Sequence, residues 1–338
     1  MIFSKRIKYL QVFFLNLTFI NHYKFHTVFI LKILYLLLLE MMMINKIKKR
    51  IINNMNKTLV SSKPGLFRPS SYPYLTGDSL RNFSDHIFDE TTSFDPALVK
   101  NNEIIFLKTD LKNIFFENYH PLIFSKYKLI THNSDFSIEE EDLRFIDEKV
   151  VHWFAAKLNV RSSEKISAIP YGLENKRYLN NGIVKNFKSV SKRTKNITKL
   201  DKILCSFNPS TNPIHREPLI ELSQKRVDLI SIKNFDNNRE YLSELSKYKF
   251  NLCPEGNNFE SHRIWESLIF RCTPIVEKNT VNSNFVELGI PLIVLDKFDD
   301  LHDLEYEDLV KMNKENEKKD YEIFTSLNYW CEVINSKV

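Results

Sequence analysis

The chain has 338 residues, of which 43% are hydrophobic and 27% charged, and its formal net charge is +6 at pH 7. This length accommodates two α/β domains, and the composition is that of a globular protein rather than a disordered or fibrous one. Residues 1–54 hold nine Lys and Arg and one acid, which leaves 39 basic and 41 acidic residues in the rest. The body of the chain is therefore close to neutral and has no basic stripe for a phosphate backbone, so nucleic acid is not an expected partner.

Residues 1–54 form an apolar and basic leader that differs from the rest of the chain. They contain no Gly, Pro, Ala or Asp and carry two apolar runs, Tyr9–Ile20 and Thr27–Ile44. The second run is just long enough to span a bilayer, although two charged residues interrupt it. Three interpretations stay open: a signal anchor, an amphipathic segment on a membrane surface, or AT-rich upstream codons translated from too early a start, before Met55. The chain is therefore expected to be membrane-associated if this leader is real and cytoplasmic otherwise.

Residues 55–190 are predicted to form a first α/β domain. Short apolar runs predict buried strands at Glu103–Thr109, Tyr127–Thr131 and Lys165–Pro170. Apolar residues at helical spacing predict a helix over Glu139–Leu158. The stretch Asn180–Lys199 is basic, rich in Asn and Ser and without periodicity, so we expect the linker between two domains there.

Residues 200–338 repeat the alternation of strands and helices more clearly. Strands are predicted at Ile203–Phe207, Arg226–Ile232, Phe250–Cys253, Thr273–Val276 and Pro291–Leu295. Helices are predicted at Arg216–Gln224, Arg239–Tyr248 and Ser261–Phe270, with an acidic helix after Leu301. The segment Tyr321–Asn335 is expected either to finish this domain or to cross back to the first. Two such halves imply doubly wound, Rossmann-like domains that face each other across a cleft, with ligands at the carboxyl ends of the strands.

The segment Asn251–Glu277 carries the strongest chemical signal in the sequence. It reads as a buried strand, a polar loop and the start of a helix. Ser261 or Glu260 can cap this helix, and the free N–H groups of its first turn suit an anion. An anion site is therefore expected where the loop meets the helix.

One face of the predicted helix combines cations with a carboxylate. His262 and Arg263 lie four and three residues before Glu266. A cation near the loop suits a diphosphate, and a carboxylate one turn deeper suits the paired hydroxyls of a ribose. The alternative is a plain Arg263–Glu266 ion pair on a solvated face. Trp265 and the flanking strands indicate a partly buried helix and favour the binding role.

Five separated strings of the sequence keep a shared order. The run Cys253-Pro-Glu-Gly-Asn257, then His262-Arg-x-Trp-Glu-x-Leu268 and Pro274-Ile-Val276, resembles the C-terminal motif of exostosin-like glycosyltransferases. The upstream strings are Thr131–Asp135, Trp153–Phe154, Ile169–Gly172, and Ser206–Phe207 with Thr211–Asn212 and Arg216. The resemblance covers Lys63 to Asp300. It implies a GT-B fold that moves a sugar from a nucleotide-sugar donor to a glycan or other hydroxyl acceptor.

This resemblance implies that the donor binds in the C-terminal domain without a metal ion, and it implies no other cofactor. Arg216 and Arg263 would neutralise the donor diphosphate, and Glu266 would bind its ribose, with His262 on the same face. Fixed positive charge of this kind stabilises the leaving group. Glu255 in the loop would contact the sugar or merely act as a cap. No Asp-x-Asp stands at a strand end, where a metal-dependent transferase would hold its diphosphate-bound cation.

An inverting transfer also needs a base for the acceptor hydroxyl. Asp135 and then His132 are the candidates, because they follow the predicted strand Tyr127–Thr131 at its carboxyl end. Both residues are equally open to a role in shaping the loop. Asp78 and Asp110 stay open as further candidates.

Two positions depart from the pattern of the resembled family. Asn258 stands where a Gly is usual, which is tolerable because Asn accepts left-handed backbone geometry. Arg271 stands where a helix-ending Gly is usual, at a cost of about 1 kcal/mol if the left-handed conformation is kept.

Other functional classes fit less well. A nucleotide-dependent phosphotransferase would need a Gly-rich phosphate loop, and none of the six glycines forms one. A catalytically inactive relative that binds a nucleotide sugar or a glycan on the same fold stays open, because Arg271 is compatible with a loss of activity.

Overall fold

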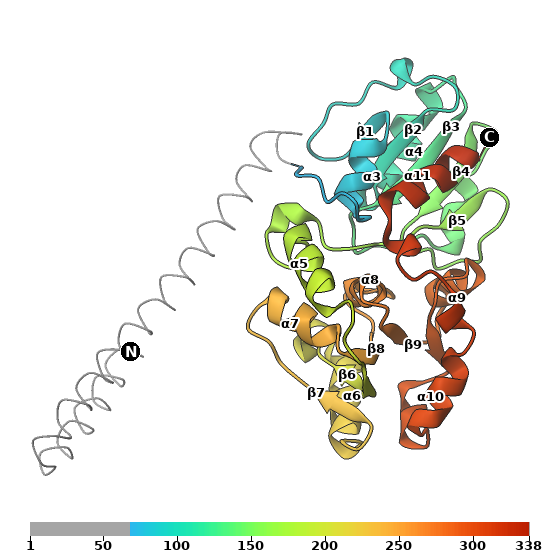
Figure 1. Ribbon diagram of the computed structural model, residues 1–338. Coiled ribbons are helices and arrows are strands. Elements are labelled where there is room, and N and C mark those ends of the chain that lie inside the picture. Colours follow the sequence, from blue (N-terminus) through green and yellow to red (C-terminus); the bar gives the residue numbers. More distant parts are fainter. Residues whose placement is uncertain (1–67, 338) are drawn as a thin grey trace, which may run out of the picture. The chain divides into compact units, whose positions relative to one another are not determined.

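The computed structural model describes residues 68–337, which contain two five-stranded parallel sheets (Figure 1). The prediction of an α/β chain with two Rossmann-like halves is confirmed. The leader at residues 1–54 lies outside the described residues. Within the described range, no helix combines the length and the apolar character needed to cross a bilayer.

The strands of the first sheet follow one another in chain order. Their bounds are β1 (His86–Phe88), β2 (Ile104–Lys108), β3 (Tyr127–His132), β4 (Val150–Ala155) and β5 (Ile166–Ala168). The helices of this half that precede β3 are α3 (Gly77–Phe83) and α4 (Lys112–Asn118). Because the strand order never reverses, this half lacks the doubly wound order that the sequence predicts for both halves.

The second sheet has the strand order β10-β9-β8-β6-β7. Its strands are β6 (Leu200–Cys205), β7 (Ile230–Ile232), β8 (Tyr248–Leu252), β9 (Thr273–Glu277) and β10 (Ile293–Leu295). Its helices are α6 (Pro213–Lys225), α7 (Asn238–Leu245), α8 (His262–Ile269), α9 (Thr280–Glu287) and α10 (Tyr306–Asn313). The first strand, β6, lies between β7 and β8, so this sheet is doubly wound with a switch point between β6 and β8. Loops that follow β6 and β8 therefore meet at one edge.

The helix predicted over Glu139–Leu158 is wrong. A short 3₁₀ helix, Glu140–Phe145, is followed by the strand β4, which pairs with β3 on one side and β5 on the other. A strand that is buried on both faces has consecutive rather than alternating apolar residues. Such a run matches helical spacing by chance, and only the β-branched Val150 and Val151 and the neighbouring aromatic residues favour a strand.

The aperiodic linker predicted at Asn180–Lys199 contains a helix, α5 (Val184–Thr194). Its buried residues are Val184, Phe187 and Val190, three residues apart. This apolar stripe is narrow and lies among Lys, Ser and Asn residues. The polar composition of the segment therefore hid the helical periodicity, and the helix was not predicted.

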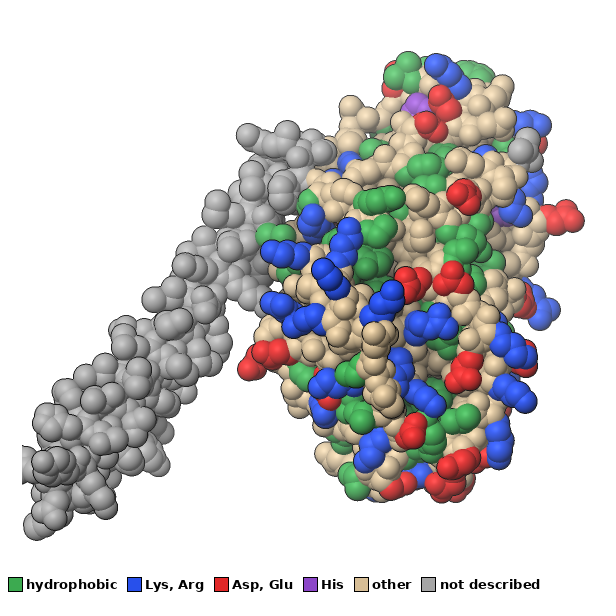
Figure 2. Space-filling view, in the orientation of Figure 1, with side chains coloured by type: hydrophobic (Ala, Val, Ile, Leu, Met, Phe, Trp, Pro, Cys, Tyr) green, Lys and Arg blue, Asp and Glu red, His purple; other side chains and the backbone are tan. Residues whose placement is uncertain are grey.

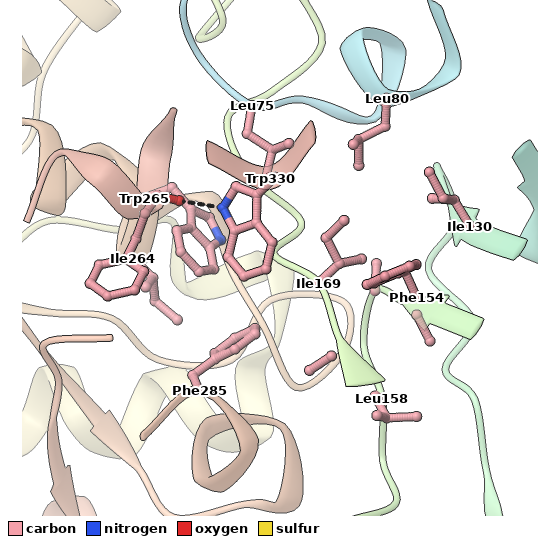
Figure 3. Close-up of a cluster of buried hydrophobic side chains, with 14 of the residues drawn as sticks. Leu75, Leu80, Ile130, Phe154, Leu158, Ile169, Ile264, Trp265, Phe285 and Trp330 are labelled. Carbon is pink, nitrogen blue, oxygen red and sulfur yellow. Dashed lines mark hydrogen bonds between the residues drawn. The ribbon is translucent and has the colours of Figure 1, made fainter. Parts of the chain in front are cut away.

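One hydrophobic core runs through both halves (Figure 3). Leu75, Phe154 and Ile169 of the first half belong to the same cluster as Trp265 and Phe285 of the second. The Trp265 and Phe285 rings meet edge to face with 5.2 Å between their centroids. A separate cluster lies around the other side of the second sheet. The halves are therefore joined by packing as well as by polar contacts.

The last helix, α11 (Leu327–Ser336), returns to the first half. It contacts α3, and the ammonium group of Lys128 on β3 donates to the carbonyls of Ile334 and Asn335, both at 3.2 Å. Of the two alternatives for Tyr321–Asn335, crossing back is the one that the structure has.

Candidate functional site

Two arginines lie at the switch point of the second sheet. Arg216 on α6 is 4% exposed, and its guanidinium donates to the carbonyls of Glu255 at 2.8 Å and Asn208 at 2.9 Å. Arg263 on α8 is half-buried and donates to the carbonyl of Ser206 at 2.7 Å. Within residues 68–337, neither guanidinium pairs with a carboxylate. Two neighbouring cations thus meet at the carboxyl ends of β6 and β8.

The two guanidinium groups affect each other electrostatically. Burial, and then the charge of Arg263, lowers the pKa of Arg216 to about 10. Arg216 therefore stays charged at neutral pH, held by carbonyl groups that cannot neutralise it. A bound diphosphate would supply the missing counter-charge, which offsets both the cost of burying Arg216 and the repulsion between the two arginines.

Glu266 lies deeper on the same helix, and it does not form the ion pair with Arg263 that was the alternative prediction. Its side chain is buried, and its Oε2 has no hydrogen-bond partner in the described part of the chain. Burial raises the pKa of Glu266 to about 7, although Arg263 opposes the shift. The Arg263 guanidinium lies over the Tyr241 ring, 5.4 Å from its centroid. An unpartnered buried acceptor of this kind suits a ligand hydroxyl.

Glu255 and the loop around it connect the two arginine-bearing segments. Its carboxylate accepts a hydrogen bond from the Asn279 amide at 2.9 Å, while its carbonyl accepts from Arg216. The amide of Asn212 donates to the carbonyl of Gly256 at 3.0 Å, which ties the loop after β6 to the loop after β8. Glu255 therefore contributes to the position of Arg216 through its backbone.

Neither of the predicted caps caps α8 through its side chain. Ser261 occupies the N-cap position without a side-chain hydrogen bond. The buried carboxylate of Glu260 instead accepts from the Tyr171 backbone N–H at 2.7 Å and the Trp265 indole at 2.5 Å. Burial raises the pKa of Glu260 to about 7, against the effect of the bond from Tyr171. Glu260 thus joins α8 to the first half.

Three aromatic rings from both halves form a column beside the arginines. Tyr171 is stacked on His132 at 4.9 Å and on His262 at 5.0 Å between ring centroids. The Nδ1–H of His262 donates to the carbonyl of Gly172 at 2.6 Å, which leaves its Nε2 as an acceptor. Burial lowers the pKa of His262, so the ring is neutral at neutral pH.

A small cavity of about 40 Å³ lies against this column and is lined from both halves. Gly77 at the start of α3 lines it, and a Cβ there would lie 1.9 Å from the Asn133 side-chain oxygen. A larger residue at this position would displace the Asn133 and His132 side chains. His132 also lines the cavity, but both of its ring nitrogens bond to backbone groups.

His132 is the last residue of β3 and Asp135 lies three residues later, so both are at the carboxyl end of this strand as predicted. Their side chains bond to different partners. His132 accepts from the Asn133 N–H at 2.7 Å and donates to the Pro170 carbonyl at 3.2 Å. Burial lowers its pKa to about 3, although the bond to Pro170 opposes this. Asp135 is 60% exposed in its side chain and accepts from the Lys157 ammonium at 3.0 Å and the Asn257 amide at 3.1 Å. Partial burial acts to raise the pKa of Asp135, but Lys157 outweighs it, and the pKa is lowered.

Lys157 is a site residue that the sequence did not indicate. It is 2% exposed, has a left-handed backbone with φ of 55°, and also donates to the Ser134 carbonyl at 2.9 Å. Its ammonium lies 4.3 Å from the centroid of the Tyr171 ring. No sequence signal marks it, because a lysine after a strand is ordinarily a solvated residue. Asn257 was likewise missed, although it stands inside the strongest string.

The two departures from the resembled pattern have different outcomes. Asn258 does not have a positive φ, so the left-handed geometry that Asn would tolerate is not needed at this position. Its amide instead donates to the Asp135 carbonyl at 2.6 Å, which a glycine could not do. Arg271 does keep the left-handed conformation, with φ of 51°.

Asp78 and Asp110, which stayed open as bases, have different surroundings. Asp78 is buried and bonds to Arg68 at 2.8 Å and to Asn133 at 3.1 Å. Asp110 is exposed beside Lys108. Within residues 68–337, no three His, Cys, Asp or Glu side chains are gathered as a metal ion requires.

The two five-stranded parallel sheets form two Rossmann-like halves, which is consistent with a two-domain GT-B fold. Solved structures with a similar fold include an alpha,alpha-trehalose 6-phosphate synthase from Burkholderia multivorans, which is 10% identical over 70% of this chain and 70% of its own, with a TM-score of 0.41. The pneumococcal O-GlcNAc transferase GtfA in complex with UDP and GlcNAc is 11% identical over 71% of this chain and 56% of its own, with a TM-score of 0.35. TarM is 12% identical over 69% of this chain and 55% of its own, with a TM-score of 0.34. No protein-family profile and no curated protein sequence matches the chain, so the resemblance to exostosin-like glycosyltransferases stays a prediction.

Proposed function

We propose that this chain is a glycosyltransferase that moves a sugar from a nucleotide-sugar donor to a hydroxyl of a glycan or similar acceptor. The observation that carries the proposal is the pair Arg216 and Arg263 at the switch point. Arg216 is buried and Arg263 half-buried, and within residues 68–337 their guanidinium groups donate hydrogen bonds to carbonyl groups and to no carboxylate. Two neighbouring guanidinium groups without a carboxylate partner are well suited to bind a diphosphate, because each can donate two hydrogen bonds to phosphate oxygens. The exostosin-like resemblance supports the same assignment.

In the proposed reaction, the acceptor oxygen bonds to the anomeric carbon of the sugar while the bond from that carbon to the diphosphate breaks. The electron pair leaves with the diphosphate, where Arg216 and Arg263 stabilise the developing charge. The Oε2 of Glu266 would accept a hydrogen bond from a ribose hydroxyl, since it has no other partner among the described residues. His262 would present its Nε2, which has no hydrogen-bond partner among residues 68–337, to the sugar, while the carbonyl of Glu255 supports Arg216.

Asp135 is the better candidate than His132 for taking the proton of the acceptor hydroxyl. Its carboxylate is ionised at neutral pH and exposed, whereas both nitrogens of His132 already bond to the backbone. Lys157 and Asn257 hold the two Asp135 oxygens in place, so they are positioning residues in this scheme. The proposed transfer inverts the anomeric carbon and uses no metal ion.

The test is release of free nucleotide from a panel of nucleotide sugars by the full chain. Each active donor is then repeated with Arg263→Ala, with Glu266→Gln and with the control Arg239→Ala, whose side chain is exposed on α7. The proposal expects turnover of at least one donor, a strong loss in the first two variants and no change in the control.

The outcomes separate the proposal from its alternative. A donor that binds to the chain through Arg263 but is never turned over, with any acceptor offered, would indicate an inactive relative that binds nucleotide sugars. Absence of binding to every donor would refute the role of the arginine pair itself.

A further inference from the structure

A second and much larger cavity lies at the opposite edge of the second sheet. Its volume is about 730 Å³, within the range of small-molecule sites. It is lined by Lys199 just before β6, Lys249 near the start of β8 and Thr273 at the start of β9. These are the amino ends of the strands, whereas Arg216 and Arg263 follow the carboxyl ends. We call it the amino-edge groove.

Helix α8 connects the candidate donor site to the amino-edge groove. His262 and Arg263 stand at its first turn, and Ile269, Phe270 and Arg271 at its other end line the groove. Eight helical residues extend over about 12 Å. The groove is therefore a separate site on the same helix and not an extension of the site already described.

One wall of the groove is basic. Its five cations are Lys192, Lys195, Lys199, Lys249 and Arg271. Within residues 68–337, only Lys249 among them pairs with a carboxylate, Asp201 at 3.7 Å. Lys199 is fixed by the carbonyls of Tyr248 at 2.9 Å and Phe270 at 2.8 Å. Figure 2 shows that Lys and Arg side chains also gather over the neighbouring α5, so the basic surface extends beyond the groove.

The rest of the groove is suited to hydroxyl groups. Its two carboxylates, Glu317 and Glu322, form no salt bridge within the described residues and are exposed. Asn313 adds a side-chain oxygen that has no hydrogen-bond partner in the described part of the chain, whereas the hydroxyls of Thr273 and Tyr321, which also line the groove, bond to each other at 2.6 Å. The lining therefore places a concentrated positive charge and a smaller number of acceptors for hydroxyls in one cavity of moderate size.

Arg271 has a backbone conformation that is unfavourable for a residue with a side chain. Arg271 ends α8 in a left-handed conformation, and the N–H groups of Arg271 and Cys272 bond to the carbonyls of Leu268 and Ser267. Helix α9 ends in the same pattern, with Gly289 at the corresponding position and φ of 83°. Glycine is the residue without strain there. An arginine in this position is thus a strained residue, and strain of this kind is often found at functional sites. Its guanidinium lies 5.3 Å from the centroid of the Tyr321 ring and lines the groove together with the lysines.

We propose that the amino-edge groove binds a phosphomonoester of a hexose-sized polyol. The phosphate lies on Lys195, Lys199 and Arg271, and the sugar hydroxyls reach Glu317 and Glu322 on the other wall. These three cations pair with no carboxylate in the described part of the chain, so they are available for charge-assisted bonds to the phosphate. The site is independent of the transferase proposal, because none of its residues belongs to the arginine pair or the aromatic column.

The test is calorimetric binding of D-glucose 6-phosphate to the full chain, with inorganic phosphate and D-glucose as the two half-ligands. We expect the ester to bind more tightly than either half. The double variant Lys195→Gln/Arg271→Gly should weaken the ester by about a hundredfold, since two charge-assisted bonds are lost. Glu322→Gln should weaken the ester but leave inorganic phosphate unchanged. Lys188→Gln, an exposed lysine of α5 outside the groove lining, is the matched control and should leave binding unchanged.

The remaining outcomes decide between this site and others. Ester binding that survives the double variant but is lost in Arg263→Ala would place the ligand in the candidate donor site and overturn the proposal. Equal binding of inorganic phosphate and the ester would overturn the sugar part. The second source of a sugar phosphate, a lipid headgroup, is tested with vesicles that contain phosphatidylinositol 4-phosphate. Vesicle binding that depends on Lys195 and Arg271 would assign the groove to such a headgroup. Absence of binding to both the ester and the vesicles would overturn the proposal altogether.

Discussion

The two halves differ in whether their buried charged side chains have a partner of opposite charge. In the first half most buried charges are paired: Asp78 with Arg68 and Arg177, Asp89 with Arg81, and Lys157 with the exposed Asp135. Lys128, which donates to two carbonyls of α11, is an exception. In the second half, Arg216 and Arg263 bond to carbonyls, and the buried Glu260 and Glu266 form no salt bridge within residues 68–337.

This difference separates scaffold from binding surface. A buried charge that already has a partner gains little from a ligand. Removing one member of the pair leaves the other buried without a counter-charge, which destabilises the fold. An unpaired buried charge is costly in the free protein and becomes favourable only when a ligand supplies the counter-charge. Substitutions in the first half should therefore affect mainly folding, and substitutions in the second half mainly turnover.

The largest effect is expected at Asp78 in the paired half. Asp78→Ala leaves the Arg177 guanidinium, which is 9% exposed, without the carboxylate it pairs with. It leaves the Arg68 guanidinium, which is 5% exposed, with the longer contact to Asp89 at 3.5 Å. Breaking a buried pair in this way costs about 3–5 kcal/mol of unfolding free energy. Urea unfolding measures it. Asp110→Ala is the control, because this exposed carboxylate contacts only Lys108 at 3.5 Å and should change stability by about 0.5 kcal/mol or less. Equal losses in the two variants would contradict the comparison.

Arg263 in the unpaired half should show the reverse behaviour. Arg263→Ala is expected to lower the rate of nucleotide release by about 10²–10³, because a fixed charge that stabilises the leaving group is lost. Its unfolding free energy should stay nearly constant, since the residue is half-buried and has only one carbonyl partner. Arg263→Lys keeps the charge without the fork and should lose about tenfold. A stability loss as large as that of Asp78→Ala would place Arg263 in the scaffold instead.

The carboxyl of Glu266 gives the comparison a pH dependence. Its pKa is about 7 in the folded chain, against 4.5 for an ordinary glutamate. Between these two pH values the folded state binds more protons than the unfolded state, so the stability contributed by Glu266 falls as pH rises and levels off above pH 7. Glu266→Gln removes this dependence. Relative to the wild type, the variant should gain about 3 kcal/mol between about pH 4.5 and pH 7. If urea unfolding gives a constant difference in stability across that range, burial does not raise the pKa of Glu266.

Much of the second half could be predicted from the sequence, for a physical reason. Its strands are short apolar runs separated by polar loops, and the helix that bears Arg263 and Glu266 follows its strand at once. Local pattern therefore placed Arg216, Arg263 and Glu266 at one edge of the sheet, where they are. The missed parts are those in which burial on both faces hides the period, as in β4, or a sparse stripe lies in polar sequence, as in α5.

The first-half part of the site was less accessible to sequence reasoning. Tyr171 and Lys157 act through contacts with residues distant in the chain, such as His262 and Asp135. Nothing local distinguishes a buried lysine in a left-handed turn from a solvated one. One ring nitrogen of His132 bonds to the carbonyl of Pro170, which is 38 residues away in the chain. The motif around His132 therefore could not show that this nitrogen is unavailable to act as a base.

The smallest expected effect lies in the matched ends of α8 and α9, which differ at one position. Both helices end with the same pair of backbone bonds, but Arg271 occupies the left-handed position in one and Gly289 in the other. Arg271→Gly should therefore stabilise the chain by about 1 kcal/mol, because the strain of a side chain at positive φ is removed. Gly289→Arg should destabilise it by about the same amount, since a Cβ at Gly289 meets only the edge of Phe324 at 3.9 Å and the backbone strain is isolated. Thermal or urea unfolding of the two variants and of their combination measures both terms. If Arg271→Gly destabilises the chain while Gly289→Arg behaves as expected, the guanidinium of Arg271 contributes to folding through the Tyr321 ring, 5.3 Å from it, and its position does not need a ligand to explain it.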